Sequence, residues 1–395
     1  MVKLLDSFTS TGAKFFAHQE AMKDLKNGKG HPITTHLMLT DVCNHSCAFC
    51  SVQAREGDSL PFDDICNYLD ILLKYGLKST ILSGGGNPIL YRCKKSGRGF
   101  DDVINAISSR GLEIGLITNG MPLCDYDVDP STQIGGHSAD HVRRSWKTVS
   151  PESLDKMMWI RISMSGFDHH EREVYVPDID PRKTTLGFSY VAHDIYREPL
   201  DPHHGKVSRT LDLISEPRDR EPTIYFEERI PELTSHFKKY VKKYKPNYLR
   251  LLPNCLEPDL IPARCSQLQK IANIVNFHAD EEVVFVQNKP PKAPKVCYLG
   301  YIHPVLTPSG YVMPCDSHCL NESAEHKLGG EPWRICHWTE IDKLYENPVR
   351  SLIEDPSKTC PGCVFSKTND LLQLVYEGKI DTTPSNTTPH HVNFV

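Results

Sequence analysis

Short apolar segments alternate with helix-like segments along this chain, and this alternation constrains the fold more than any other feature. The intervening residues 61–75, 100–109 and 228–243 carry apolar side chains at helical spacing. Strands that alternate with helices form βαβ units and a parallel sheet, so the pattern predicts an α/β fold. Six units are fewer than the eight that close a (β/α)8 barrel. The segments predicted as strands are 35–40, 79–83, 112–118, 158–163, 186–191 and 248–252.

The chain divides into regions of different composition. Residues 1–31 are polar and mixed, and we expect a small helical or irregular extension there. Residues 32–288 hold the strand and helix units, and the proline–lysine run at 289–295 is typical of a linker. The region 289–366 carries its own cysteines, and we expect the tail 367–395 to be partly disordered.

Charge and hydropathy exclude several classes of protein. The 45 Lys and Arg residues against 50 Asp and Glu give a net charge of −5. An acidic chain is a poor match for the nucleic-acid backbone, although the lysines in 238–243 keep nucleic acid open as a partner. No apolar run approaches the ~18 residues that span a bilayer, and the first residues lack the apolar core of a secretory signal. We therefore expect a cytoplasmic protein without a membrane partner.

The chain contains 14 cysteines, which the reducing cytosol would keep from forming disulfides. Close-spaced sets therefore indicate metal or iron–sulfur ligation. Cys43, Cys47 and Cys50 form a CxxxCxxC loop directly after the first predicted strand. Three thiolates on one short loop can hold three irons of a [4Fe–4S] cluster and leave the fourth open to a small molecule. Zinc is the alternative, although a structural zinc site normally needs four closing ligands.

A second set of cysteines lies beyond the linker. Cys297 and Cys315 are followed by Cys360 and Cys363, which form a CxxC pair. Four thiolates can close a second [4Fe–4S] cluster, and a zinc site with two cysteine pairs is the alternative. Cys319 is either a bystander or an alternative ligand.

The CxxxCxxC loop, with the aromatic Phe49 before its last cysteine, resembles the signature of the radical S-adenosylmethionine superfamily. The resemblance extends in element order from about residue 33 to 290, and it implies a partial (β/α)6 barrel with the cluster at its mouth. In that family the open iron of a [4Fe–4S] cluster on the three cysteines chelates S-adenosylmethionine. One electron from the reduced cluster cleaves this cofactor to a 5′-deoxyadenosyl radical, which abstracts a hydrogen from a substrate.

Further segments match the motifs of the family in order. SGGGNP at 83–88 takes the place of the GGEP turn, where glycine lets the backbone approach the methionyl ammonium closely. Asn87 replaces the usual glutamate, and its amide oxygen still accepts a hydrogen bond without the full charge. TNG at 118–120 and SMSG at 163–166 resemble the motifs after the third and fourth strands. The residues that we expect to contact S-adenosylmethionine are Phe49, Gly85, Gly86, Asn87, Asn119 and Ser163.

The second cysteine set resembles the twitch domain, the shorter relative of the SPASM domain, which is attached to many enzymes of this superfamily. The resemblance implies a small C-terminal domain with an auxiliary [4Fe–4S] cluster, in which residues 336–355 form a helical hairpin between the ligand pairs. A cluster closed by four cysteines is better suited to electron transfer than to substrate binding.

The resemblance implies an enzyme that begins by abstracting hydrogen from carbon. We favour a small polar or nucleotide-linked substrate, isomerisation or oxidation as the outcome, and a reductant such as flavodoxin or ferredoxin as the electron donor. A maturase of ribosomal peptides is the alternative within the superfamily. A non-catalytic zinc protein or an iron–sulfur redox protein is the alternative outside it.

Two further candidate functional residues lie on or just after the sixth predicted strand. Cys255 comes just after this strand, where it could donate a hydrogen atom or a proton to a product radical, although such a cysteine is more often a small buried hydrophobe. Arg250 alternates with apolar neighbours, so it could point into the barrel and bind a carboxylate or a phosphate.

Overall fold

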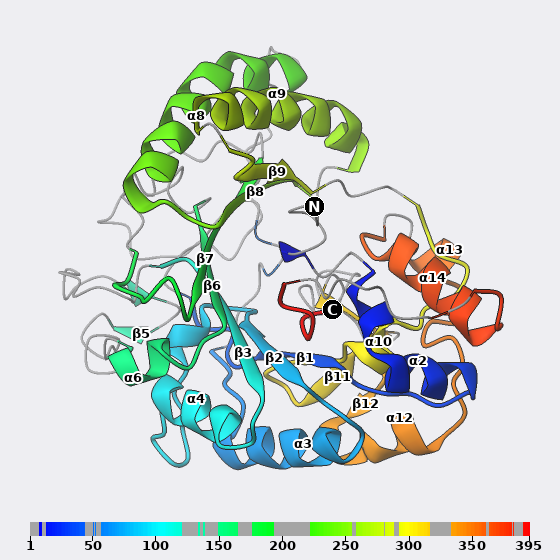
Figure 1. The fold of residues 1–395 in the computed structure, drawn as a ribbon. Coiled ribbons are helices and arrows are strands. Elements are labelled where there is room, and N and C mark those ends of the chain that lie inside the picture. Colours follow the sequence, from blue (N-terminus) through cyan, green and yellow to red (C-terminus); the bar gives the residue numbers. More distant parts are fainter. Residues whose placement is uncertain are drawn as a thin grey trace.

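An arc of parallel strands, covered on the outside by helices, forms the core of the molecule (Figure 1). The structure is a computed structural model. It describes residues 8–9, 13–43, 50, 52, 57–120, 133–134, 137–138, 149–164, 176–192, 222–254, 258–279, 281–287, 292–316, 333–360, 363–380, 382 and 390–395.

In the described part of the chain, eight neighbouring strands run parallel, in the order β10, β1, β2, β3, β6, β7, β8 and β9. Their bounds are Thr34–Met38 (β1), Ser79–Ser83 (β2), Glu113–Thr118 (β3), Trp159–Ser163 (β6), Thr185–Ala192 (β7), Tyr248–Pro253 (β8), Val284–Val286 (β9) and Val305–Leu306 (β10). The six predicted strands are confirmed to within two residues at each end. The sequence did not predict β9 and β10, because runs of three and two residues are too short to show a periodicity.

The region after the linker extends this sheet. β10 pairs in parallel with β1, and β11 (Tyr311–Met313) and β12 (Cys336–His337) follow it in antiparallel pairing. Residues 336–355 were expected to form a helical hairpin, and this expectation was wrong, because the segment begins with β12 and continues into the short helices η6 (Trp338–Glu340) and α12 (Asp342–Glu346). The pairing of β12 with β11 is a tertiary contact that the local sequence pattern does not show. A separate twitch-like domain stays a prediction.

Amphipathic helices cover the outside of the arc. The predicted helices at 61–75 and 100–109 are confirmed as α3 (Phe62–Lys74) and α4 (Phe100–Ser108), which bury one apolar side each. α8 (Pro222–Tyr244) starts six residues before its predicted position and packs on α9 (Ile261–Ala279). The other described helices and strands are η1 (Lys14–Ala17), α2 (Gln19–Lys26), η2 (Pro88–Leu90), β4 (Gln133–Ile134), β5 (His137–Ser138), α6 (Pro151–Leu154), η4 (Pro258–Leu260), α10 (Leu299–Ile302), α13 (Pro356–Thr359) and α14 (Ser366–Tyr376).

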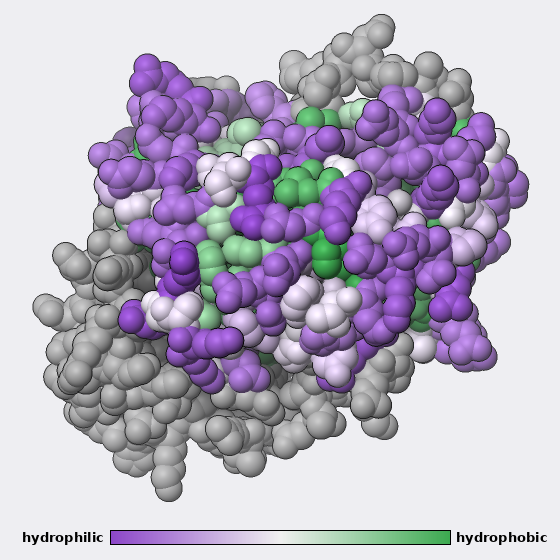
Figure 2. Space-filling model, turned by 90° about the horizontal axis from the view of Figure 1, so that it is seen from below, coloured by the Kyte–Doolittle hydropathy of each residue, from purple (hydrophilic) through white to green (hydrophobic). Residues whose placement is uncertain are grey.

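Polar side chains cover the outer faces of these helices. Figure 2 looks at the face that carries α3, α4 and α12, and hydrophilic side chains cover most of its described part. Among the described residues the large hydrophobic side chains that stay exposed are Ile274, Phe277 and Tyr376. No helix in the described ranges has both the length and the apolar composition that a membrane crossing requires.

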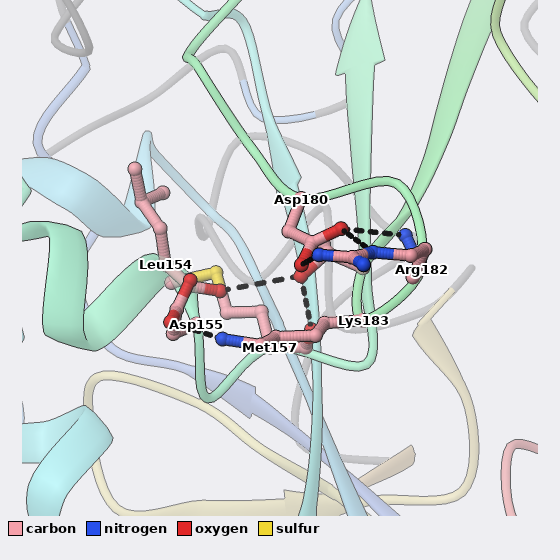
Figure 3. A network of polar contacts seen from close by, with 7 residues as sticks. Leu154, Asp155, Met157, Asp180, Arg182 and Lys183 are labelled. Carbon is pink, nitrogen blue, oxygen red and sulfur yellow. Dashed lines mark hydrogen bonds and ion pairs between the residues drawn. The ribbon is translucent and has the colours of Figure 1, made fainter.

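A network of polar contacts holds the turn that leads into β7 (Figure 3). Asp180 accepts hydrogen bonds from the backbone N–H of Arg182 at 3.0 Å and from its Nε at 2.9 Å. The buried hydroxyl of Thr184 donates to the backbone oxygen of Met157 at 2.9 Å, which ties the turn to the end of α6. The Asp180–Arg182 pair lies at the surface, where such a pair contributes little to stability.

Residues 390–395 lie inside the arc, at the amino ends of the strands (Figure 1). Thr34 of β1 and Ser79 of β2 both donate hydrogen bonds to the backbone oxygen of Asn393. The ring of Phe394 packs edge-on against Trp159 with the ring centres 5.3 Å apart, and Ile81 joins the same cluster. We expected a partly disordered tail from residue 367, but its described parts are structured as α14 and as this floor segment, 390–395.

We expect Phe394→Ala to lower the free energy of unfolding by about 3 kcal/mol, because the buried ring leaves a cavity against Trp159. Phe277→Ala is the matched control, since its ring is 80% exposed and its loss should change stability by less than about 0.5 kcal/mol. Denaturant unfolding of both variants at equal cofactor loading makes the comparison. Equal stabilities for the two variants would contradict the packing of the floor segment.

We expect the chain to lose stability in acid because of the lowered pKa of His391 in the floor segment. Burial lowers the pKa of His391 to about 4, and Lys14 and His390 act in the same direction. The unfolded chain, with a pKa near 6.5, therefore binds more protons between pH 6.5 and 4, so stability falls as the pH falls through this window. His391→Gln should reduce the loss between pH 7 and pH 5 by about 1 kcal/mol, allowing for partial exposure. Thermal unfolding at the two pH values measures it, and an undiminished loss in the variant would contradict the shift.

Candidate functional site

The predicted cofactor-binding residues that the structure describes gather at one edge of the arc. Parallel strands place their carboxyl ends together, and Cys43 follows β1 while Gly85 and Gly86 follow β2. Asn119 follows β3, and Ser163 is the last residue of β6. Segments that are far apart in the sequence thus meet at this edge, which we call the mouth of the arc.

The cysteine loop at the mouth is held at both ends. Cys43 and Cys50 are half-buried thiols, whereas Cys47 and Phe49 lie outside the described residues. The hydroxyl of Thr40 donates to the backbone oxygen of Asp58 at 2.7 Å and accepts from Ser59 at 2.8 Å. The chain before the loop is therefore fastened to the chain after it. The assignment of Cys43, Cys47 and Cys50 to the catalytic cluster stays a prediction.

The glycine turn after β2 lies directly against the chain that leads into the cysteine loop. The backbone N–H of Gly86 donates to the oxygen of Thr40, and that of Asn87 donates to the oxygen of Val42, both at 2.9 Å. A Cβ atom on Gly86 would lie 2.0 Å from the oxygen of Val42, and one on Gly84 would lie 2.0 Å from the oxygen of Gly86. Only glycine permits this approach of two backbones.

Asn87 connects the glycine turn to the end of β3. Its side chain is 2% exposed. Its Nδ2 donates to Oδ1 of Asn119 at 2.7 Å, and its Oδ1 accepts from the hydroxyl of Thr118 at 3.0 Å and from the backbone N–H of Ile89 at 3.4 Å. We predicted that this Oδ1 accepts a hydrogen bond from S-adenosylmethionine. That contact stays a prediction, and the described contacts give Asn87 a role in positioning Asn119.

Ser163 belongs to a row of polar residues that crosses three strands. Ser163 pairs with Ser189 of β7, and Ser189 pairs with Arg250 of β8. Trp159 and Ser163 lie on the same side of β6, and Trp159 contacts the floor segment inside the arc, so this row faces the interior. Nη1 of Arg250 donates to Oε1 of Gln287 at 2.8 Å. The structure thus places Arg250 in the interior, as predicted, while Cys255 lies outside the described residues.

Arg161 is an interior residue that the sequence analysis missed. It lies two residues before Ser163 on β6, and therefore on the same inner side. The alternation of Trp159, Arg161 and Ser163 with buried isoleucines was the signal that could have revealed it, because an arginine inside an apolar strand needs a reason.

Three cysteines of the second set, Cys297, Cys360 and Cys363, come together from separate segments. Burial raises the pKa of Cys297, and the nearby thiols of Cys363 and Cys360 raise it further. Burial raises the pKa of Cys363 to about 12, with Cys360 and Asp316 acting in the same direction. Cys315 is also buried, and its place beside the other three thiols stays a prediction. Thiolates this close repel one another, and a bound metal removes that repulsion.

A site for a single metal ion is a different arrangement from a cluster site. Within the described parts of the chain, no three His, Cys, Asp or Glu side chains are arranged to hold one metal ion. Cys319, the spare thiol of the second set, lies outside those parts.

Comparisons with known proteins find a family and relatives that match part of the chain. Residues 37–160 match the family model described as the Radical SAM superfamily. A probable GTP 3′,8-cyclase of Saccharolobus solfataricus is 31% identical over 132 residues, which are 32% of this chain and 39% of that protein. An S-adenosylmethionine-dependent nucleotide dehydratase of Selenomonas ruminantium is 28% identical over 119 residues, which are 30% of this chain and 40% of that protein. The chain thus spans about two fifths of the length of these curated relatives.

A solved structure resembles the chain over a longer stretch. Streptococcus suis SuiB bound to S-adenosylmethionine is 13% identical, with a TM-score of 0.47, over 84% of this chain and 70% of that chain. A likeness of this size carries no argument about function.

Proposed function

This chain belongs to the radical S-adenosylmethionine superfamily, and we propose that it abstracts a hydrogen from a carbon of a small polar or nucleotide-linked substrate. Members of this superfamily work with a [4Fe–4S] cluster and S-adenosylmethionine. When bound, these cofactors supply the 5′-deoxyadenosyl radical by reductive cleavage. The observation that carries the proposal is the close contact between the glycine turn at Gly86 and the chain at Val42 that leads into the cysteine loop.

The residues at the mouth fit these cofactors. Cys43, Cys47 and Cys50 would hold the cluster, because the described ends of their loop are fastened to each other through Thr40. The turn at 84–86 would receive the methionyl end of S-adenosylmethionine, since its glycines present bare backbone. The hydroxyl of Ser163 and the amide of Asn119 lie at the ends of neighbouring strands and would hydrogen-bond to the rest of the cofactor.

The outcome that we propose is isomerisation or oxidation. The names of the two curated relatives, a GTP cyclase and a nucleotide dehydratase, support a nucleotide-linked substrate. The interior row from Ser163 to Arg250 supports a polar substrate, because it carries hydroxyl and guanidinium groups inside the arc.

We assign the second cysteine set to an auxiliary [4Fe–4S] cluster. Cys297, Cys315, Cys360 and Cys363 would hold it, and the packing of Cys297, Cys360 and Cys363 in one cluster supports this assignment. Four cysteines leave no coordination position for substrate, so the cluster would transfer electrons. A flavodoxin or a ferredoxin would reduce the catalytic cluster.

Anaerobic reconstitution tests the proposal. We expect about eight irons and eight sulfides per chain, as two [4Fe–4S] clusters require, and formation of 5′-deoxyadenosine that depends on both dithionite and S-adenosylmethionine. Iron without cleavage of S-adenosylmethionine would reduce the protein to an electron carrier, and zinc in place of iron would leave a non-catalytic metal protein. About four irons per chain, with cleavage of S-adenosylmethionine intact, would contradict only the assignment of the auxiliary cluster.

A further inference from the structure

Tyr248 and Arg161 meet across the interior of the arc. Arg161 of β6, Gly187 of β7 and Tyr248 of β8 form one row in the register of the three strands. A Cβ atom on Gly187 would lie 2.0 Å from Cζ and 2.4 Å from the hydroxyl oxygen of Tyr248. The tyrosine ring therefore lies over the glycine and points its hydroxyl towards β6. Phe8 stacks on the ring with the centres 4.5 Å apart and holds it there.

Arg161 lines an interior that solvent can reach. Its guanidinium carbon lies 5.6 Å from the centre of the Trp159 ring. Its Nε is buried and has no hydrogen-bond partner among the described residues. The side chain as a whole is nevertheless partly exposed. A guanidinium that is deep, partly wet and incompletely paired has the features of a binding group rather than of a packed core residue.

Several charged and titratable groups of the described residues lie around Tyr248 and Arg161. The guanidinium groups of Arg161 and Arg250 both act on the hydroxyl of Tyr248. The described carboxylate that acts on Arg161 is Asp316. Burial lowers the pKa of His36, which Asp316 also faces, to about 4, so that this histidine is neutral at pH 7. A partly exposed guanidinium in a partly dry interior attracts an anion.

Arg161 lies deeper in the arc, farther from the mouth, than Ser163 and Arg250. Arg250 shares a row with Ser163, and Arg161 lies two residues deeper on β6, which is about 6.6 Å further from the mouth. Below Arg161, Phe394 and Trp159 close the floor. An anionic group bound to Arg161 would therefore lie deeper in the arc than Ser163 and the proposed cofactor site.

We propose that Arg161, oriented by Tyr248 and assisted by Arg250, binds an anionic group of the substrate, either a carboxylate or a phosphate. The proposal rests on the proposed function, because it names the substrate class of that same site. A guanidinium binds both anions through two parallel hydrogen bonds, which a lysine ammonium cannot reproduce.

Anion-dependent thermal stability of the reconstituted full chain tests the proposal. Inorganic phosphate and succinate are titrated separately, with chloride at equal ionic strength as the reference. We expect one of the two to raise the Tm of the unmodified chain saturably by about 3 °C or more, and the anion that saturates distinguishes phosphate from carboxylate. Arg161→Gln should lose this rise, and Arg161→Lys should weaken the apparent Kd by about tenfold.

Arg182→Gln is the matched control, since Arg182 is an exposed arginine on the turn before β7 and should keep the full rise. If Arg161→Gln does not fold, Tyr248→Phe keeps the ring and removes the hydroxyl, and it should weaken the apparent Kd. A chain that responds to neither anion beyond chloride, or a full response in Arg161→Gln or Tyr248→Phe, would overturn the proposal. The titration needs neither S-adenosylmethionine nor a reductant, so its failure is distinguishable from a failure to form 5′-deoxyadenosine.

Discussion

Cys43→Ala and Cys50→Ala are each expected to lower the rate of 5′-deoxyadenosine formation by at least about 100-fold. The loop offers three thiolates, and a [4Fe–4S] cluster with one open iron needs all three. Either variant leaves two ligands, so the cluster is lost or loses the geometry that binds S-adenosylmethionine. Iron and sulfide content, electron paramagnetic resonance of the reduced protein and the 5′-deoxyadenosine assay measure the three consequences separately.

Cys66→Ala is the control for the loss of a thiol. Cys66 is a half-buried cysteine on α3, where burial raises its pKa and Arg110 and Asp70 are its charged neighbours. Its replacement should leave cluster content and cleavage unchanged. If Cys43→Ala kept a full cluster and full cleavage, the ligand assignment would be wrong. Equal losses in Cys43→Ala and Cys66→Ala would point to a general sensitivity to cysteine loss instead.

Gly86→Ala is expected to lower the formation of 5′-deoxyadenosine by about 10- to 100-fold, the range in which supporting contacts around a metal site act. The added Cβ would lie 2.0 Å from the backbone oxygen of Val42 and 2.5 Å from the backbone carbonyl carbon of Asp41. Both are backbone atoms, so no side-chain rotation relieves the contact. The chain that leads into the cysteine loop must shift, and Cys43, which we propose as a cluster ligand, shifts with it. The affinity for S-adenosylmethionine and the rate of its cleavage are the measurements.

Substitutions of two other glycines serve as comparisons for Gly86→Ala. Gly99 has a φ of −110°, and a Cβ atom added to it would meet nothing within 4 Å, so Gly99→Ala should behave as the unmodified chain. Gly85→Ala should fall between the two, because its Cβ would meet Asp41 at an ordinary 3.5 Å. An activity of Gly86→Ala equal to that of Gly99→Ala would show that the turn does not press on the cysteine loop.

Local patterns were sufficient for the main strands but not for the edges of the sheet. β2 spans residues 79–83, the same five residues that the sequence predicted. β10 and β12 are two residues each, and they exist because β1 and β11 offer backbone partners to them. A strand that depends on its neighbour leaves no periodicity in its own sequence.

Spacing and periodicity are local properties, so they were enough to predict the parallel α/β fold, the order of its strands along the chain and the two sets of cysteines. The contact of Gly86 with Val42 and the hydrogen bonds of Asn87 with Thr118 and Asn119 could be seen only in the folded chain. The tertiary structure also decided that the floor segment 390–395 closes the interior below Arg161. These contacts join residues that are far apart in the chain, and their energies depend on distances and burial that appear only when the strands have paired.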